Sequence, residues 1–344
     1  MKLISFVIPT YNFAEFIGET LDSILQEDSS FYEIVIYDGF STDDTESVVR
    51  RYLDKYDFIR YVRSSKRNNI DIDLNNAILE ATGRYIWTLS SDDLLTKGWL
   101  SCFLNTFENS QSDIYLFPAI HCDIQMNRLY RYSIARIGSK TPLKVYLNNN
   151  SDYLSYLEMV RTSEGLFSFC SACVVDRAKI YKTDLLLDAN GTCWRYATRI
   201  IQMSMTYPTS ISIANDFIIL KRGDNDSFGR SGILKRLDIA TIQWTNSISL
   251  LKLNPFLKSS LLKRVHSDVS FLVLFYIKQV EINTHDDLIH YENIVTNIYP
   301  GKSLFSWVLL KTPISKYLGF LFMILLKCNA GKIYKQYLIN FRYK

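Results

Sequence analysis

The first 95 residues alternate between short apolar runs and amphipathic stretches, and this alternation constrains the fold more than any other feature. Runs typical of buried parallel strands lie at 3–9, 33–37, 59–63 and 85–89. Apolar residues at helical spacing lie between these runs, at 13–24, 43–56 and 71–81. Gly83 is expected to end the third helix. The alternation predicts a parallel sheet with helices on both faces and right-handed crossovers.

Polar side chains follow three of the four predicted strands. Thr10–Asn12 follows the first strand, Asp38 the second, and the pair Asp92 and Asp93 the fourth. Ligands of such sheets bind beyond the carboxyl ends of the strands. These three polar clusters are therefore expected to meet at one crevice.

The adjacent carboxylates of Asp92 and Asp93 point to a metal ion. Two neighbouring carboxylates at the end of a buried strand repel each other unless a cation neutralises them. Mg²⁺ takes one or two carboxylates together with substrate phosphates, and it would stabilise a leaving nucleoside diphosphate as a Lewis acid. Asp is also favoured at a helix N-terminus, so the pair alone leaves a structural explanation equally open.

The other two clusters also allow two interpretations each. Asp38 would contact the edge of a pyrimidine, or form an Asx-turn that only shapes its loop. Thr10–Asn12 would contact a nucleoside, or cap the following helix.

Three segments of this region resemble the motifs of the family 2 glycosyltransferases in order and spacing. They are 6–12 (Phe-Val-Ile-Pro-Thr-Tyr-Asn), 38–45 (Asp-Gly-Phe-Ser-Thr-Asp-Asp-Thr) and 81–93, which ends in Ser-Ser-Asp-Asp. The resemblance implies the α/β GT-A nucleotide-diphospho-sugar transferase fold, with a mostly parallel sheet between helices. It implies donor nucleotide contacts at Pro9, Thr10, Tyr11, Asn12, Asp38, Asp71 and Asp92. It also implies a divalent metal, Mg²⁺ or Mn²⁺, on Asp93 and Asp92.

A narrower resemblance lies at 220–228 (Leu-Lys-Arg-Gly-Asp-Asn-Asp-Ser-Phe). With the Ser-Asp-Asp form of the metal motif and the chain length, this segment is similar to bacterial O-antigen abequosyltransferases. Those enzymes transfer a 3,6-dideoxyhexose from a CDP-sugar to a lipid-linked oligosaccharide. The resemblance implies a diphosphate or acceptor loop of Arg222, Asp224, Asn225 and Ser227. The guanidinium of Arg222 suits phosphate oxygens, whereas a tight Gly-Asp-Asn turn is the structural alternative.

Two departures from the family pattern concern the chemistry. Ser91 replaces the usual leading Asp of the metal motif. Inverting relatives carry a Glu-Asp pair whose Asp is the general base, but the matching stretch 188–195 has no such pair. Its nearest carboxylates are Asp184 and Asp188, and Asp188 is taken as the candidate base, which must reach the acceptor hydroxyl. Inversion and retention both remain open.

The rest of the chain is expected to add mixed structure and then helices. Further strands are predicted at 113–117, 168–175 and 212–220. We expect a GT-A domain over 1–228 and a helical, basic region over 229–344. From Gly301 to Lys344 the chain carries eight Lys or Arg residues and no Asp or Glu. This composition favours contact with anionic lipid, with a solvated basic helix packed on the main domain as the alternative.

The remaining features bear on location. No stretch reaches the ~20 apolar residues that a spanning helix needs, and the first nine residues do not form a signal peptide. Six Cys residues form no paired metal framework, and Cys170 and Cys173 are expected to be buried thiols in a strand. We therefore expect a cytoplasmic protein, peripheral at the inner face of the bacterial inner membrane.

Together these features favour an enzyme that moves a deoxyhexose such as abequose from a CDP-sugar. The acceptor would be an undecaprenyl-diphosphate-linked O-antigen oligosaccharide in lipopolysaccharide biosynthesis. The alternatives are a UDP- or GDP-sugar enzyme for another surface polysaccharide, and a non-catalytic nucleotide-sugar-binding protein. A nucleotidyltransferase would show a Gly-rich loop after the first strand, and a net charge of only +4 argues against a nucleic-acid partner.

Overall fold

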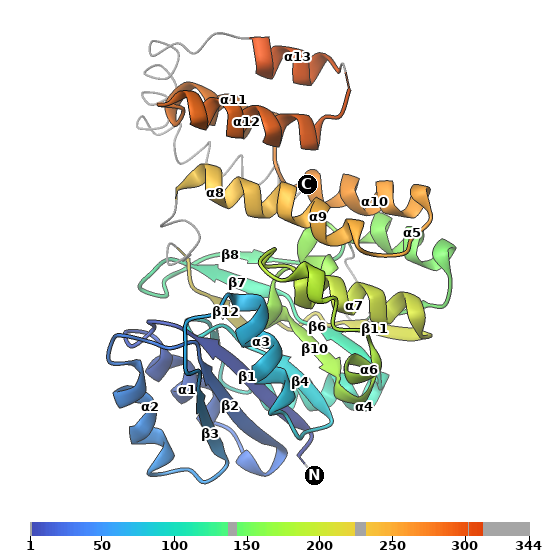
Figure 1. The fold of residues 1–344 in the computed structure, drawn as a ribbon. Helices are drawn as coiled ribbons and strands as arrows, with labels where there is room; N and C mark the ends of the chain where they lie inside the picture. The colour runs from blue at the N-terminus through green and yellow to red at the C-terminus, as the bar shows by residue number, and fades with distance from the viewer. Residues whose placement is uncertain (1, 137–142, 224–231, 302, 312–344) are drawn as a thin grey trace. The chain divides into compact units, whose positions relative to one another are not determined.

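The computed structural model describes residues 2–136, 143–223, 232–301 and 303–311 of the 344-residue chain (Figure 1). The chain folds into two compact units, Met1–Asn225 and Asp226–Lys344. The predicted domain boundary after residue 228 falls outside the described residues and stays a prediction.

The N-terminal unit is built on an eight-stranded sheet with the order β3-β2-β1-β4-β10-β6-β11-β9. Its strands are β1 (Ile4–Thr10), β2 (Tyr32–Asp38), β3 (Ile59–Arg63), β4 (Tyr85–Thr88), β6 (Ile114–Leu116), β9 (Leu143–Leu147), β10 (Cys173–Asp176) and β11 (Thr209–Ile213). The four strands from β3 to β4 are parallel, which confirms the predicted core of the sheet. β10 runs antiparallel to both of its neighbours, so the complete sheet is mixed.

A second, four-stranded sheet has the order β5-β12-β7-β8 and was not predicted. Its strands are β5 (Leu94–Leu95), β12 (Ile219–Lys221), β7 (Ala119–Cys122) and β8 (Arg128–Tyr132). The single strand predicted at 212–220 is wrong, because Asn215 and Asp216 interrupt the apolar run and its two halves join different sheets.

The strand predicted at 168–175 is also too long. Only β10 is extended, and Cys170–Ala172 form a 3₁₀ turn before it. Cys173 is buried in β10 as expected, whereas Cys170 lies in the turn and is partly exposed. The turn is relevant to function because it places Ser171 beside the acidic pair.

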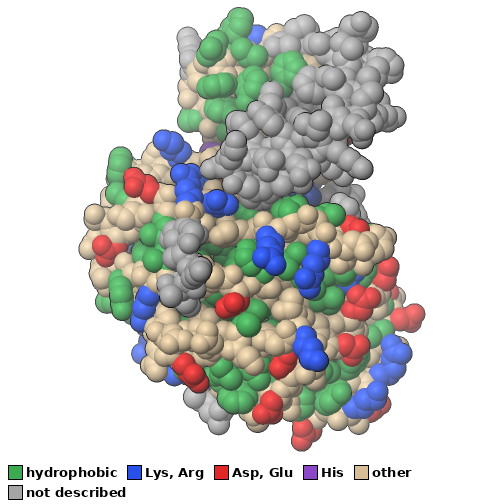
Figure 2. Space-filling model, turned by 180° about the vertical axis from the view of Figure 1, so that it is seen from behind, with side chains coloured by type: hydrophobic (Ala, Val, Ile, Leu, Met, Phe, Trp, Pro, Cys, Tyr) green, Lys and Arg blue, Asp and Glu red, His purple; other side chains and the backbone are tan. Residues whose placement is uncertain are grey.

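Seven α-helices in the described part of the N-terminal unit flank these sheets (Figure 1). They are α1 (Ile17–Leu25), α2 (Thr45–Leu53), α3 (Ile70–Leu79), α4 (Trp99–Ser110), α5 (Asn150–Met159), α6 (Arg177–Lys182) and α7 (Arg195–Thr206). On the face of this unit in Figure 2, several Lys and Arg side chains lie in the upper part, whereas most Asp and Glu side chains lie lower.

Helix α3 begins with a side-chain cap but does not end at Gly83 as predicted. The Asn69 side chain accepts a hydrogen bond from Ile72 N at 3.1 Å, and the helix ends at Leu79 with Glu80 as its C-cap. Gly83 instead lies against β1, where an added Cβ would be 2.8 Å from the backbone nitrogen of Ser5. The close approach of two backbones explains the glycine.

Aromatic side chains fix the centre of the sheet. Phe6 of β1 lies 5.1 Å, between ring centroids, from both Trp87 of β4 and Trp99 of α4. All three side chains are fully buried. Burial of rings of this size contributes strongly to stability and holds the two parallel strands in place, so their carboxyl ends have a defined position.

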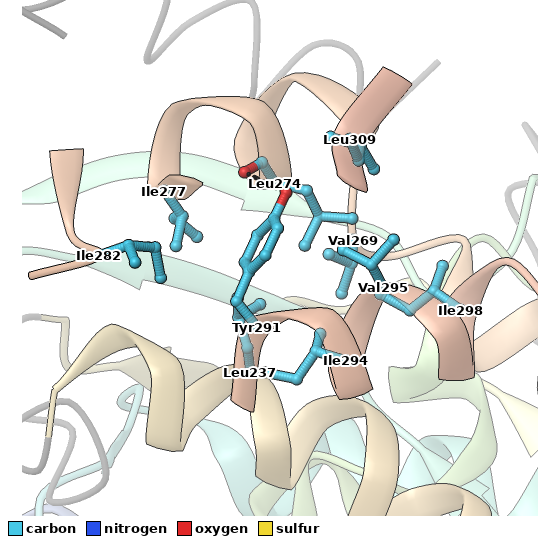
Figure 3. Close-up of a cluster of buried hydrophobic side chains, with 10 residues drawn as sticks. All are labelled: Leu237, Val269, Leu274, Ile277, Ile282, Tyr291, Ile294, Val295, Ile298 and Leu309. Carbon is cyan, nitrogen blue, oxygen red and sulfur yellow. Dashed lines mark hydrogen bonds between the residues drawn. The ribbon is translucent and has the colours of Figure 1, made fainter. Parts of the chain in front are cut away.

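The C-terminal unit consists of helices where it is described, as predicted. They are α8 (Ile233–Asp238), a π-helical turn (Ile239–Gln243), α9 (Trp244–Ser249), α10 (Pro255–His266), α11 (Phe271–Val280), α12 (His285–Ile298) and α13 (Leu304–Lys311). Its core gathers apolar side chains from α8, α11, α12 and α13 around Tyr291, whose hydroxyl donates to Leu274 O at 3.0 Å (Figure 3). Among the described residues, none of the helices has the length and apolar character that crossing a bilayer requires.

Candidate functional site

Hydrogen bonds join the loops that follow β1 and β2. Thr10 lies opposite Asp38 in the parallel register, and Gly39 N donates to Thr10 O at 2.8 Å. Asn12 N donates to Ser41 Oγ at 2.9 Å. Asn12 adopts a left-handed φ of 58°, and its Oδ1 accepts from the nitrogen of the residue after Ser41 at 2.8 Å. The first two motif segments therefore form one continuous rim.

The third motif segment joins the same rim. Ser91 Oγ donates to Pro9 O at 2.8 Å, and β4 is the parallel neighbour of β1. Asp38 and Asp92 thus follow strands that end on one edge of the sheet. The three segments therefore meet at one edge of the sheet, and the expected crevice at this edge stays a prediction.

Two groups on this rim concern the predicted nucleoside contacts. Asp38 is fully buried, its Oδ1 accepts from Ser41 N at 2.7 Å, and its Oδ2 accepts from the Tyr61 hydroxyl. These bonds shape the loop, as the Asx-turn alternative requires, and a contact of Asp38 with a base stays a prediction. Thr10 Oγ1 is buried and has no hydrogen-bond partner among the described residues, so it can still bond to a ligand.

A cluster beside the rim was missed by the sequence analysis. The Arg67 guanidinium lies 3.7 Å from the centroid of the Tyr11 ring and pairs with Asp73 Oδ2 at 3.1 Å. An added Cβ on Gly39 would be 2.3 Å from Asp73 Oδ2, so the motif glycine lets α3 approach the rim. Burial raises the pKa of Asp73 above its ordinary value. The sequence feature that could have indicated this cluster is Asp73, an acidic residue in the first turn of a predicted helix.

The acidic pair lies in a network of protein hydrogen bonds. Asp93 Oδ2 accepts from Ser171 Oγ at 2.6 Å, and Asp93 Oδ1 accepts from Arg222 N at 3.1 Å. Asp92 Oδ1 accepts from the Ser90 hydroxyl. Burial first, and the charge of Asp92 second, raise the pKa of Asp93 above its ordinary value.

Arg222 contacts both members of the pair, but its side chain is committed to protein partners. Its Nε donates to Asp92 O at 3.0 Å, and its Nη1 donates to Ile124 O at 2.6 Å. Its Nη2 pairs with Glu19, and the guanidinium lies 4.6 Å from the centroid of the Phe16 ring. A phosphate contact of Arg222 stays a prediction. Asp224, Asn225 and Ser227 lie outside the described residues.

The carboxylates of Asp92 and Asp93 fit a divalent ion whose other ligands do not come from His, Cys, Asp or Glu side chains of the described residues. Over the described ranges, His, Cys, Asp and Glu side chains form no group of three or more that could hold a metal. Each oxygen of Asp93 accepts one protein hydrogen bond and keeps a further lone pair. A cation would also relieve the repulsion between two buried carboxylates. Asp92 and Asp93 therefore suit Mg²⁺ or Mn²⁺ whose other ligands are substrate phosphates and water.

Asp71 holds a loop in place. Its Oδ2 accepts from Gly191 N at 2.8 Å and Cys193 N at 2.9 Å, and its Oδ1 accepts from Arg195 N at 3.2 Å. These bonds fix the segment that opens α7, and a donor contact of Asp71 stays a prediction. Asp188 is exposed in the 3₁₀ turn Leu187–Ala189 just before this loop, so its assignment as the base also stays a prediction.

Comparison with known proteins identifies the family. Residues 5–181 match the family model described as glycosyl transferase family 2. The chain belongs to glycosyl transferase family 2. Its similarity to the abequosyltransferase RfbV of Salmonella typhimurium is 33% identity over 274 residues, which covers 78% of this chain and 79% of the relative.

Other relatives and solved structures match at lower identity. The GalNAc(5)-diNAcBac-PP-undecaprenol beta-1,3-glucosyltransferase of Campylobacter jejuni is 28% identical over 33% of this chain and 38% of its own length. The crystal structure of S. aureus TarS with UDP-GlcNAc aligns with a TM-score of 0.63 at 18% identity, over 87% of this chain and 80% of TarS. The chain is therefore a family 2 glycosyltransferase with the GT-A fold.

Proposed function

We propose that the enzyme transfers a 3,6-dideoxyhexose such as abequose from a CDP-sugar to an undecaprenyl-diphosphate-linked O-antigen oligosaccharide. The similarity to an abequosyltransferase over 78% of the chain supports the donor sugar. A second relative acts, by its name, on a diphosphate-linked undecaprenol, which supports the class of acceptor. The observation that carries the proposal is that all three motif segments meet at the edge of β2, β1 and β4.

The residues on this edge would have different roles in binding the donor. Thr10 Oγ1 and the segment 9–12 would hold the nucleoside, next to the loop that Asp38 shapes. Asp92 and Asp93 would hold Mg²⁺ or Mn²⁺, which neutralises the charge that develops on the leaving diphosphate. Ser171 and the backbone of Arg222 fix the orientation of the Asp93 carboxylate before substrate arrives. Such preorganisation lowers the reorganisation that the reaction would otherwise require.

A thermal-shift comparison of CDP, UDP and GDP, each with and without Mn²⁺, tests the donor. Ligand binding to the folded state raises stability by mass action, by about 2.7 kcal/mol at 100 times Kd. We expect the largest rise in melting temperature with CDP and Mn²⁺, and release of CDP when CDP-abequose and the lipid-linked oligosaccharide are both supplied. A larger shift with UDP or GDP would contradict the assigned donor and favour another surface polysaccharide.

We also propose that the C-terminal unit contacts the anionic inner face of the bacterial inner membrane. Helix α13 exposes Leu304 by 73%, Phe305 by 54% and Trp307 by 62%. The segment from Gly301 onward carries eight cations and no acidic residue. Trp is favoured at the interface between membrane and water, and cations are attracted to anionic headgroups. Peripheral attachment would place the enzyme beside its lipid-linked acceptor.

A further inference from the structure

Glu164 carries a buried carboxylate oxygen that has no hydrogen-bond partner among the described residues. Its side chain is only 16% exposed, and its Oε1 lies 3.4 Å from Lys221 Nζ. Its Oε2 is buried and accepts no hydrogen bond from any residue that the structure describes. A carboxylate oxygen withdrawn from water without a donor is costly, and such groups in native proteins call for a functional explanation.

Two connections place Glu164 next to the acidic pair. Lys221, its ionic partner, directly precedes Arg222, whose backbone nitrogen donates to Asp93. The Lys221 ammonium also lies 4.2 Å from the centroid of the Phe169 ring. Phe169 stands two residues before Ser171, which donates to the other oxygen of Asp93.

The charge of Lys221 also links Glu164 to Asp93. The Lys221 ammonium pulls down the pKa of Asp93, against the burial that raises it, so one cation acts on both carboxylates. Glu164 lies in the 3₁₀ turn Ser163–Leu166, whose preceding Thr162 accepts from Glu164 N at 3.3 Å. The turn therefore fixes the backbone position from which the Glu164 side chain extends.

The neighbouring carboxylates are less suited to accept a proton from an acceptor sugar. Both oxygens of Asp71 are bonded to backbone nitrogens, and both oxygens of Asp38 and Asp93 have protein donors. Asp188 is exposed to water in its turn. A general base accepts the hydroxyl proton on an oxygen lone pair, and Glu164 Oε2 differs from these oxygens in accepting no hydrogen bond from any described residue.

We propose that Glu164 is the general base of the transfer reaction. This inference rests on the proposed function. The proton of the acceptor hydroxyl passes to Glu164 Oε2 while the acceptor oxygen forms its bond to the anomeric carbon. The bond from that carbon to the diphosphate breaks, and its electron pair leaves on the nucleoside diphosphate. Lys221 holds the Glu164 side chain in position for this step.

The experiment compares Glu164→Gln with wild type, using CDP-abequose and the undecaprenyl-diphosphate-linked oligosaccharide. General-base catalysis contributes about 10²–10⁴-fold, so kcat should fall at least about 100-fold in the Gln variant. The KM for the donor and the thermal shift with CDP should not change, because the nucleotide contacts lie elsewhere. Glu164→Asp should recover part of the activity, because it restores a carboxylate at this position.

Two further variants sharpen the comparison. Glu158→Gln changes an exposed carboxylate on α5, six residues earlier, and should keep wild-type kinetics. A Glu164→Gln enzyme within threefold of wild type, a lost response to CDP, or a large loss confined to Asp188→Asn would each overturn the assignment. A wild-type enzyme that releases no CDP in the presence of acceptor would instead overturn the proposed function.

Discussion

Removal of the Asp71 carboxylate tests how the loop before α7 is held. In Asp71→Ala, the nitrogens of Gly191, Cys193 and Arg195 lose their acceptor together. Gly191 and Cys193 adopt left-handed φ angles of 87° and 68°, so the loop curls its N–H groups around one anion. The carboxylate therefore acts as a cap for α7 supplied by α3.

The loss of folding stability expected in Asp71→Ala follows from two opposing contributions. Hydrogen bonds to a charged group are worth about 1.5–3 kcal/mol each, so three bonds set an upper limit near 5–9 kcal/mol. Burial opposes them and raises the pKa of Asp71 above its ordinary value, which means that the ionised side chain costs desolvation energy. We expect a net loss of about 3 kcal/mol. At about 2–4 °C per kcal/mol for a unit of this size, the melting temperature should fall by about 6–12 °C.

Circular dichroism melts of the full chain at neutral pH measure this change. Asp184→Ala, which removes an exposed carboxylate of the same segment, is the matched control and should shift the midpoint by less than about 2 °C. Asp71→Asn should lie between wild type and Asp71→Ala, because the amide keeps one acceptor oxygen but turns a donor toward the loop. A midpoint for Asp71→Ala within 2 °C of the control would refute the proposed cap.

Two more predictions concern the acidic pair and the membrane. The folded state raises the pKa of Asp93 above the unfolded value near 3.9, so the stability of the wild-type protein should fall as pH rises from about 4 through the raised pKa. Thermal melts across this pH range should show a weaker dependence on pH for Asp93→Asn. The same variant should have no transferase activity. Trp307→Glu should reduce flotation with phosphatidylglycerol-containing vesicles, whereas Phe256→Glu, which alters a side chain exposed by 69% on α10, should not; equal flotation of both variants would contradict the membrane contact of α13.

The parallel half of the main sheet was predictable because its signal is local. The strands β1 to β4 are apolar runs separated by amphipathic helices, and their predicted ends differ from the observed ones by a residue or so. The second sheet was not predictable, because β5 and β12 have only two and three residues and pair across the chain. Strands so short carry no periodicity of their own.

The site was predictable in its position but not in its contacts. Topology places the ends of parallel strands on one edge, so the meeting of Thr10, Asp38 and Asp92 followed from the pattern alone. The partners of each side chain depend on residues far away, such as Gly191 for Asp71 and Ser171 for Asp93. No local pattern encodes such pairs, so the bonds of Asp71 to the loop before α7 could not be predicted from the sequence.

A contact with a residue distant in sequence also explains why Ser91 replaces the usual Asp of the metal motif. Ser91 is 2% exposed, and its hydroxyl donates to the carbonyl of Pro9. A carboxylate has no proton to donate, and at this position it would face a carbonyl oxygen with its own negative charge. Serine therefore joins the third motif to the first strand through a hydrogen bond that aspartate is unable to make. Asp92 and Asp93, which follow Ser91, remain the proposed ligands of a divalent metal, so the motif keeps its two carboxylates despite the serine.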